Sequence, residues 1–237
     1  MTAMFAVISF SACSDDDEGK GKVPTEMRYV KTIDSGKNII NIEYDEQHRI
    51  TKFGNSVLVY NGNTVQIMGL SSSQTIPYER IQLNNEGNVI ASESYDEYSK
   101  TYKTHATYEY DSAGRLIAGN YILDNINYSY RWENGNCYIV GSTDPYTYTI
   151  KYTTHKTPPC NVDFSTGKWF LTYGLPIGKQ CSNLVEIDET SSKERDYVEG
   201  YRYTYEFDKD GYISKIVETW YANGEKDEKT VYEITYY

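Results

Sequence analysis

The chain has 237 residues, a net charge of −11, and 26 tyrosines against only 6 phenylalanines. Its length is that of one large domain, and its tyrosine content favours strands whose rings are half-buried while their hydroxyls stay in water. The acidic residues are spread along the chain with no basic stripe, which argues against binding of nucleic acid or of an anionic lipid surface.

The first twelve residues, MTAMFAVISFSA, are mostly apolar and stop at Cys13. Small residues directly before a cysteine are typical of the lipobox of a bacterial lipoprotein signal peptide. Phe10 stands where leucine is usual, and no Lys or Arg precedes the apolar run. We predict a signal peptide over residues 1–12, lipidation of Cys13 and a true start codon upstream. The alternative is a frayed N-terminus with a buried cysteine.

Residues 13–27 form the predicted tether, which is too polar and charged to pack into a core. A diacylglycerol and an N-acyl chain on its cysteine would supply more than the two hydrophobic anchors that stable membrane attachment needs. An acidic run after the cysteine resembles the surface-export signal of Bacteroidetes lipoproteins, and the alternative is a plain charged spacer. The run consists of Asp15, Asp16, Asp17 and Glu18.

Four segments of the remaining residues, 28–237, repeat one pattern, and they begin at Ile42, Ile81, Tyr108 and Tyr205. Each has a strand of period-two alternation, Asp or Asn, polar residues, usually Gly, and a second strand. The Asp or Asn side chain can accept bonds from backbone amides two residues on, and Gly can take the positive φ that closes a hairpin loop. The paired turn residues are Asn84 and Gly87, Asp111 and Gly114, and Asp208 and Gly211.

In the first copy, His48 stands where glycine would be, so we expect that turn to be looser or differently shaped. Uneven spacing between the copies argues against a solenoid or propeller of fixed period. We therefore predict one all-β domain, an antiparallel meander of hairpins rolled into a barrel-like sheet. In its closing strand Tyr236 and Ile234 alternate with Thr235 and Glu233, so the apolar set is expected to face inward, as in a soluble monomer.

The pattern breaks over residues 156–187, where Pro158 and Pro159 end a strand and no period is clear. We predict a short helical or irregular excursion, packed over an open edge or end of the sheet. Three cysteines of the mature chain cannot all pair. Cys160 and Cys181 bracket the excursion and are the candidate disulfide, with free buried thiols as the alternative. The aromatic and aliphatic residues crowded in the excursion are Trp169, Phe170, Leu171, Tyr173, Leu175 and Ile177.

The sequence predicts no metal or cofactor site. His48, His105 and His155 are scattered, with no partner at metal-ligand spacing. The acidic turn at Asp208 is similar to the first half of a calcium-binding loop, but the glutamate that closes such a loop should fall at position 217, which is Val217. The chain also has no nucleophile elbow, P-loop or zincin helix.

Three features together resemble a Bacteroidetes family of secreted lipoproteins of unknown function with a porin-like fold. One is the lipobox with its acidic tether, and another is the hairpin repeat, which is also similar to tyrosine–aspartate repeat proteins. The third is GKQCSNLVEI, since family members carry a similar Gly-Lys-x-x-Ser-Asn-Leu segment before the strands resume. The resemblance covers nearly the whole mature chain. It implies a barrel-like β fold and a place in the cell envelope, and it brings no catalytic residues.

We therefore expect a lipid-anchored, surface-exposed outer-membrane protein with a non-enzymatic binding or scaffold role, and a glycan or a protein as its ligand. Tyr121, Trp132 and Trp220 are candidates for stacking on sugars. The alternative is a hydrolase acting on glycans or envelope polymers, although no carboxylate pair stands out among 34 acidic residues. A deep pocket with two convergent carboxylates would favour the hydrolase, and a shallow aromatic groove would favour binding.

Overall fold

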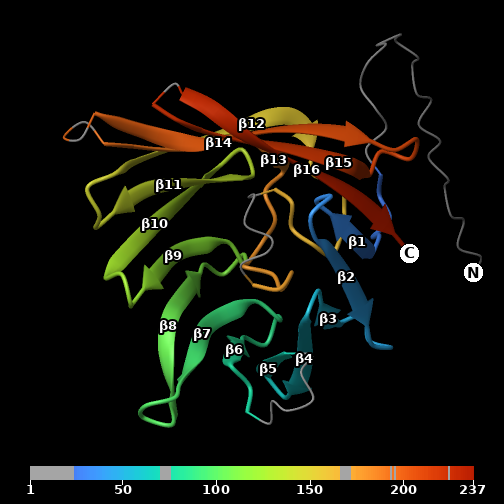
Figure 1. Ribbon diagram of the computed structural model, residues 1–237, viewed down its shortest axis with the longest axis vertical. Coiled ribbons are helices and arrows are strands. Elements are labelled where there is room, and N and C mark those ends of the chain that lie inside the picture. Colours follow the sequence, from blue (N-terminus) through green and yellow to red (C-terminus); the bar gives the residue numbers. More distant parts are fainter. Residues whose placement is uncertain (1–23, 70–75, 166–171, 193, 195, 224) are drawn as a thin grey trace, which may run out of the picture.

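A computed structural model describes residues 24–237 except 70–75, 166–171, 193, 195 and 224. Sixteen strands form one antiparallel sheet that curls into a nearly closed barrel (Figure 1). The described residues contain no helix long and apolar enough to span a membrane. The order and pairing of the strands confirm the predicted all-β antiparallel meander.

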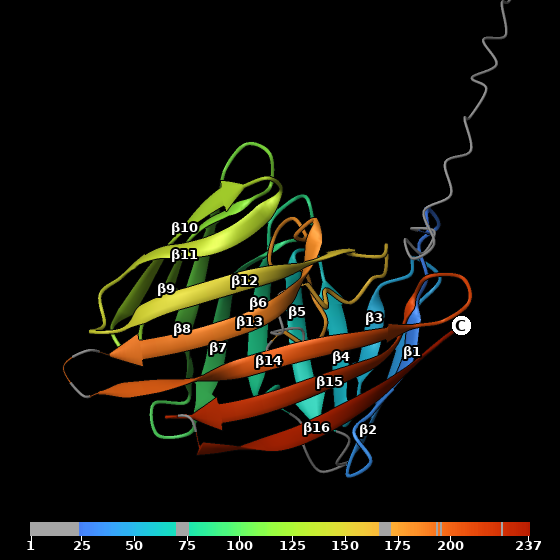
Figure 2. The same ribbon diagram turned by 90° about the horizontal axis from the view of Figure 1, so that it is seen from above.

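The strands alternate in direction along the chain, and β12 to β16 lie side by side as one wall of the barrel (Figure 2). They are β1 (Val30–Asp34), β2 (Ile39–Tyr44), β3 (Ile50–Phe53), β4 (Ser56–Asn61), β5 (Thr64–Gly69), β6 (Glu79–Leu83), β7 (Val89–Asp96), β8 (Thr101–Tyr110), β9 (Leu116–Tyr121), β10 (Ile126–Glu133), β11 (Asn136–Ser142), β12 (Thr147–Lys156), β13 (Asn183–Ser192), β14 (Tyr197–Phe207), β15 (Ile213–Ala222) and β16 (Glu225–Tyr236).

The barrel wall closes through its first and last strands but has a gap elsewhere. β1 pairs with β16, with Ile33 opposite Ile234. Consecutive strands of the chain pair with each other, with one exception. β11 and β12 do not pair, although only residues 143–146 separate them in the chain, and they form the two edges of the sheet. We call this gap between β11 and β12 the seam.

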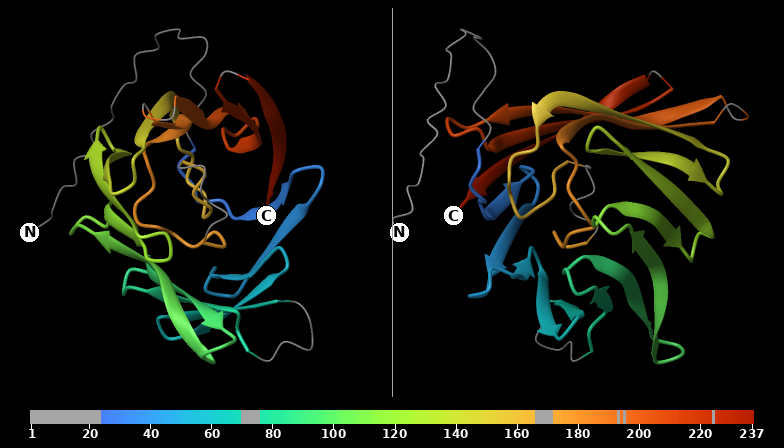
Figure 3. Two further views of the ribbon diagram at one scale, coloured as in Figure 1. Left: turned by 60° about the vertical axis from the view of Figure 1, so that its left-hand side comes forward. Right: turned by 180° about the vertical axis from the view of Figure 1, so that it is seen from behind.

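Residues 157–165 and 172–182 lie inside the barrel, and we call these described segments the plug (Figure 3). Backbone bonds fasten the plug to the wall: the amide of Val89 donates to Pro176, that of Lys179 to Gly114, and that of Ser182 to Gly135. These bonds hold the plug at the barrel end that carries the repeated turns. It therefore packs at an end of the sheet, one of the two predicted positions, and the structure adds that it lies inside the wall (Figure 3).

The excursion is also shorter than predicted, because β12 runs to Lys156 and β13 already begins at Asn183. Its described residues are irregular rather than helical, which matches one of the two predicted alternatives. Trp169, Phe170 and Leu171 lie outside the described residues.

The core lies between the plug and the inner face of the wall. Alternate strand residues such as Ile33, Ile67 and Ile213 are fully buried, and so are Val162 and Phe164 of the plug. The inward face of the closing strand follows the prediction, since Ile234 is buried while Glu233 is exposed. The interior near the plug is therefore packed with side chains rather than left as an open channel.

The repeated turns share one geometry. Asp111 Oδ1 accepts bonds from the amides of Ala113 and Arg115 at 2.9 and 3.0 Å, and Gly114 has a φ of +72°. The other two pairs repeat this arrangement. Asn84 and Asp208 each accept two amide bonds through Oδ1, and Gly87 and Gly211 have φ values of +84° and +90°.

The turn at His48 corrects one expectation. Asp45 Oδ1 accepts from the amides of Gln47 and Arg49 at 3.0 and 2.9 Å, as in the other copies. His48 adopts a φ of +61°, so its turn is neither looser nor differently shaped. The imidazole stacks on the ring of Tyr29, with 4.6 Å between ring centres. Histidine tolerates the left-handed region better than most residues, and this stack adds a contact that glycine would lack.

The tyrosines near strand ends explain part of the unusual composition. Each uses its hydroxyl to donate a bond to a main-chain carbonyl of the adjacent strand, at 2.5 to 2.9 Å, while its ring packs inward. Phenylalanine could fill the same space but not reach this acceptor. The donor and acceptor pairs are Tyr44 and Val30, Tyr110 and Val89, Tyr152 and Cys137, Tyr205 and Val185, and Tyr236 and Ile213.

Cys160 and Cys181 are separate buried thiols, so the candidate disulfide between them is not formed in this structure. Cys160 Sγ donates to the carbonyl of Val162 at 3.1 Å, whereas Cys181 Sγ lies 3.4 Å from the hydroxyl of Tyr152. Burial raises the pKa of both thiols. They lie near the two ends of the plug and contact different neighbours.

Candidate functional site

Two hollows lie one above the other on the inner face of the barrel beside the seam. The inner cavity has a volume of about 90 Å³ and the outer cleft about 560 Å³. Residues two apart on a strand share a face, so the lining of one hollow continues into the lining of the other. On each of three strands, one residue lines the inner cavity and the residue two positions away lines the outer cleft. These pairs are Tyr130 and Tyr128 on β10, Ile150 and Tyr148 on β12, and Asp188 and Thr190 on β13.

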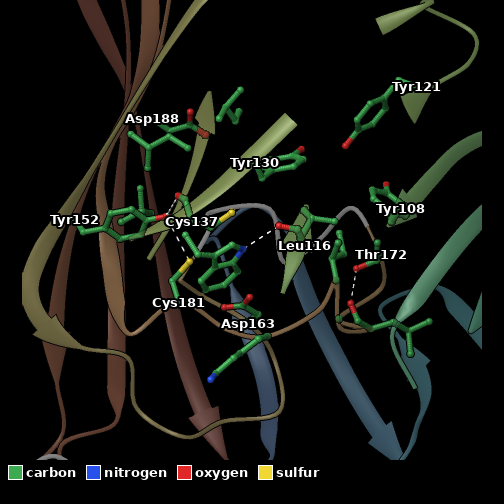
Figure 4. Close-up of a pocket in the computed structure, with 18 residues that line it drawn as sticks. Tyr108, Leu116, Tyr121, Tyr130, Cys137, Tyr152, Asp163, Thr172, Cys181 and Asp188 are labelled. Carbon is green, nitrogen blue, oxygen red and sulfur yellow. Dashed lines mark hydrogen bonds between the residues drawn. The ribbon is translucent and has the colours of Figure 1, made fainter. Parts of the chain in front are cut away.

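The inner cavity is walled by aromatic side chains and floored by the plug (Figure 4). Among them Tyr130 is half-buried, and Trp132 donates through Nε1 to the carbonyl of Leu116 at 2.9 Å. Small-molecule sites usually measure about 300–1,000 Å³, whereas one water takes about 30 Å³ of the liquid. The inner cavity is therefore large enough for a few waters but not for a sugar ring.

Two carboxylates line this inner cavity, Asp163 from the plug and Asp188 from β13 (Figure 4). Asp163 Oδ1 accepts from the amide of Ser165 at 2.8 Å and from its hydroxyl at 2.5 Å. Asp163 is exposed only to the small cavity and not to bulk water. This burial disfavours the charged form and raises the pKa of Asp163. These carboxylates therefore share an enclosed space without room for a glycosidic substrate.

A row of tyrosine rings separates the inner cavity from the outer cleft. Successive ring centres are 6.2 Å apart for Tyr108 and Tyr121, 5.5 Å for Tyr121 and Tyr128, and 5.4 Å for Tyr128 and Tyr148. Each of these pairs is edge-to-face, an arrangement that aromatic rings favour. The last pair crosses the seam from β10 to β12. We call these four residues the tyrosine layer.

Asp144 fixes the seam end of the tyrosine layer. Its carboxylate accepts from the hydroxyl of Tyr148 and, at 3.1 Å, from the amide of Tyr146. The hydroxyls of Tyr148 and Tyr128 are 3.1 Å apart. Burial and the bond to Asp144 raise the pKa of Tyr148. Side-chain hydrogen bonds of Tyr128, Asp144 and Tyr148 therefore cross the seam, where β11 and β12 form no backbone hydrogen bonds with each other.

The outer cleft combines aromatic rings with carboxylates and lies within the size range of ligand sites. A hydrogen bond to Glu199 raises the pKa of Tyr197 to about 12. Both charged residues in the lining described for this cleft are acidic. The residues are Ile126, Tyr128, Asp144, Tyr146, Tyr148, Thr190, Tyr197 and Glu199.

The residues singled out in the sequence fall in different places. Tyr121 and Trp132 line the inner cavity, whereas Trp220 lies on β15, opposite Tyr201 of β14. His155 lies against Phe207. The described residues contain no group of three or more His, Cys, Asp or Glu side chains that could hold a metal ion. Cys13 and the acidic run at 15–18 lie outside the described residues.

One polar cluster escaped the sequence analysis because its members come from three strands and the plug. His105 Nδ1 lies 3.1 Å from the hydroxyl of Ser94, and its Nε2 lies 3.7 Å from Glu79. Ser94, His105 and Glu79 thus stand in the arrangement of the nucleophile, base and acid of a hydrolase triad. The hydroxyl of Tyr173 donates to Glu79 at 2.5 Å, however, so the acid already holds the plug. Tyr173 therefore fastens the plug to β6 through Glu79.

The comparisons with known proteins address the fold. No family model matches the chain, and no curated protein matches it. A solved porin-like protein from Bacteroides vulgatus matches with a TM-score of 0.55 and 13% identity, over 89% of this chain and 99% of that one. A porin-like protein from Bacteroides uniformis matches with a TM-score of 0.58 and 15% identity, over 88% and 96%. The chain thus shares the barrel fold of these porin-like proteins, as the resemblance implies.

Proposed function

We propose that this is a lipid-anchored protein of the bacterial cell envelope, whose barrel stands outside the membrane and binds a ligand in the outer cleft. The cleft carries this proposal, because it is of ligand size and combines four aromatic rings with two carboxylates beside the seam. The envelope location is supported by the fold shared with porin-like proteins of Bacteroides and by the lipobox at Cys13.

The polarity of the wall supports a barrel that does not span the bilayer. A membrane-spanning barrel has an apolar band outside and a polar interior. Here the buried apolar residues line the interior. The outer face has scattered apolar residues such as Ile39 and Val140, but it also carries cross-strand ion pairs such as Lys52 with Glu43 and Lys215 with Glu206, each at 2.7 Å. A lipid-facing band with these charges would be costly, so the attachment is assigned to the lipid on Cys13.

The path of the chain gives the barrel an orientation on the membrane. The described chain begins at the plugged end, where the amide of Arg28 donates to Pro159 and its guanidinium contacts Asp208 and Asp210 at 3.1 and 2.7 Å. β11 starts beside the plug at Asn136 and ends at Ser142, next to the outer cleft. A tether from Cys13 therefore directs the plugged end toward the membrane and the cleft away from it.

Binding is favoured over hydrolysis by the place of the carboxylates. The two that share the inner cavity, Asp163 and Asp188, lie in about 90 Å³, which is too little for a glycosidic bond and its two sugars. The outer cleft is wider, and both of its carboxylates already accept bonds from the protein, Asp144 from Tyr146 and Tyr148, and Glu199 from Tyr197. These features are those of a recognition site.

Lipidation is tested in cells that make the wild-type chain or Cys13→Ala. Wild type should incorporate radioactive palmitate and Cys13→Ala should not. Labelling that survives the substitution would refute the anchor. Replacing Asp15 to Glu18 with alanine should keep the label but reduce cleavage by protease added to intact cells. Unchanged cleavage would mean that the acidic run is only a spacer.

A further inference from the structure

We propose that the outer cleft binds a neutral saccharide of one or two sugar units. This inference rests on the binding role proposed above and names the ligand class of the same site. A sugar ring has an apolar face of C–H groups and a rim of hydroxyls, so its site needs flat aromatic faces together with hydrogen-bond acceptors. The outer cleft supplies both on rigid strands and on the short connection between β11 and β12.

The aromatic surface is fixed in orientation before a ligand arrives. The rings of Tyr128 and Tyr148 meet at 83° and their hydroxyls are 3.1 Å apart. These rings form the floor of the cleft, and Tyr146 and Tyr197 complete the aromatic lining. Because strands and hydrogen bonds already hold the floor, little side-chain entropy remains to be lost when a flat ligand binds.

The carboxylates of the cleft can accept hydrogen bonds from the hydroxyls of a sugar. An ionised carboxylate offers about four acceptor positions. Asp144 uses some of them for the amide of Tyr146 and the hydroxyl of Tyr148, and Glu199 accepts from Tyr197. The remaining positions can accept from neighbouring hydroxyls of a sugar. The hydroxyl of Thr190 adds a group that can both donate and accept.

The charge and the volume of the outer cleft restrict the class of saccharide further. Two carboxylates in one lining disfavour phosphorylated sugars and uronic acids, because like charges would be brought together in a partly desolvated site. The volume of about 560 Å³ is within the ligand range, whereas the tyrosine layer and the small cavity below it stop a longer chain from penetrating. A short neutral saccharide that enters from the open end satisfies each constraint.

The test is calorimetry on the full chain carrying Cys13→Ala, so that lipid does not interfere. The probes are neutral hexoses, N-acetylhexosamines and their disaccharides, with glucuronic acid, choline and short peptides as the comparison set. We expect a neutral saccharide to bind. Tyr146→Ala and Tyr197→Ala should each weaken binding about tenfold or more, because each removes a ring. Tyr98→Ala, at a fully exposed residue far along the chain from the cleft, should leave binding unchanged.

Tyr197→Phe keeps the ring and is the second variant in case an alanine variant does not fold. It should retain most of the binding, which separates the ring from the hydroxyl. If no neutral saccharide binds, or if cleft variants and Tyr98→Ala behave alike, the carbohydrate inference is wrong. Binding of a peptide or choline that depends on Tyr146 and Tyr197 would overturn the ligand class and keep the binding role. Binding of no probe through the cleft would count against both.

Discussion

The hydroxyl of Tyr152 donates to the carbonyl oxygen of Cys137 at 2.5 Å and so joins β12 to β11 across the seam. The neighbouring ring of Tyr138 packs edge-to-face on Tyr152, with 5.4 Å between centres. Farther along the seam, Tyr148 of β12 reaches Tyr128 of β10, the strand beyond β11, and their hydroxyls are 3.1 Å apart. Tyrosine side chains thus hold β12 against β11 and β10, although β11 and β12 share no ladder.

Removing the Tyr152 hydroxyl should loosen the seam specifically. We expect Tyr152→Phe to lower the free energy of unfolding by about 1 kcal/mol, the usual net value of a hydrogen bond, and to speed amide hydrogen exchange in β11 and β12. Tyr205→Phe is the matched control, because Tyr205 donates to Val185 at 2.8 Å between strands that already pair. Tyr205→Phe should lower the free energy of unfolding, measured in urea, by about the same amount. It should not speed hydrogen exchange in β11 and β12. Equal exchange in the two variants would show that the seam does not depend on Tyr152.

The turn glycines should be sensitive to a single added methyl group. Gly114 and Gly211 have φ values of +72° and +90°, so Gly114→Ala and Gly211→Ala should each cost about 1–2 kcal/mol through backbone strain. Gly119 is the control, because its φ is not in the left-handed region and a Cβ there would come no nearer than 3.4 Å to Tyr130. Urea denaturation measures all three. A loss at Gly119→Ala as large as at the turns would contradict the assigned hairpin geometry.

Alkaline pH should unfold the barrel through its tyrosines. Burial raises the pKa of Tyr60 and Tyr232 to about 12, and it raises the pKa of strand-end tyrosines such as Tyr44 and Tyr236 in the same direction. In the unfolded chain these groups ionise near pH 10. Their contribution to stability is therefore complete below about pH 10 and is lost as pH rises toward the folded-state pKa.

The expected slope is about 1.4 kcal/mol per pH unit for each tyrosine that ionises only on unfolding. Thermal unfolding at pH values between neutral and strongly alkaline, followed together with tyrosinate absorbance, measures it. The melting temperature should stay level up to about pH 10 and then fall steeply. Tyrosinate absorbance that rises fully at pH 10 without unfolding would show that the rings are exposed.

Local patterns in the sequence predicted most of the fold. Period-two alternation identified the strands, and the pairs Asp111 with Gly114 and Asp208 with Gly211 matched the turn geometry because those interactions span only a few residues. The turn at His48 was predicted wrongly because the stabilising ring, Tyr29, lies outside the turn, in the segment just before β1. The plug position and the state of its cysteines likewise depend on contacts distant in sequence.

The candidate site was less predictable, since it is assembled from β10 to β14. Period-two alternation in the sequence is enough to place Tyr146 and Tyr148 on one face, but nothing local distinguishes Asp144 or Glu199 among 34 acidic residues. The gap between β11 and β12 is also invisible in the sequence, because both strands have ordinary alternation and a short connection. Tyr121, a candidate for stacking on sugars, instead packs against Tyr108 and Tyr128 in the tyrosine layer.

The central claim is that the barrel stands outside the membrane and is held there by a lipid on Cys13. Detergent phase separation of wild type and Cys13→Ala tests it most directly. Wild type should enter the detergent phase, and Cys13→Ala should remain in the aqueous phase as a folded, β-rich monomer. Recovery of Cys13→Ala only in detergent, folded and heat-modifiable on gels, would contradict the account, because it would mean that the wall itself spans the bilayer.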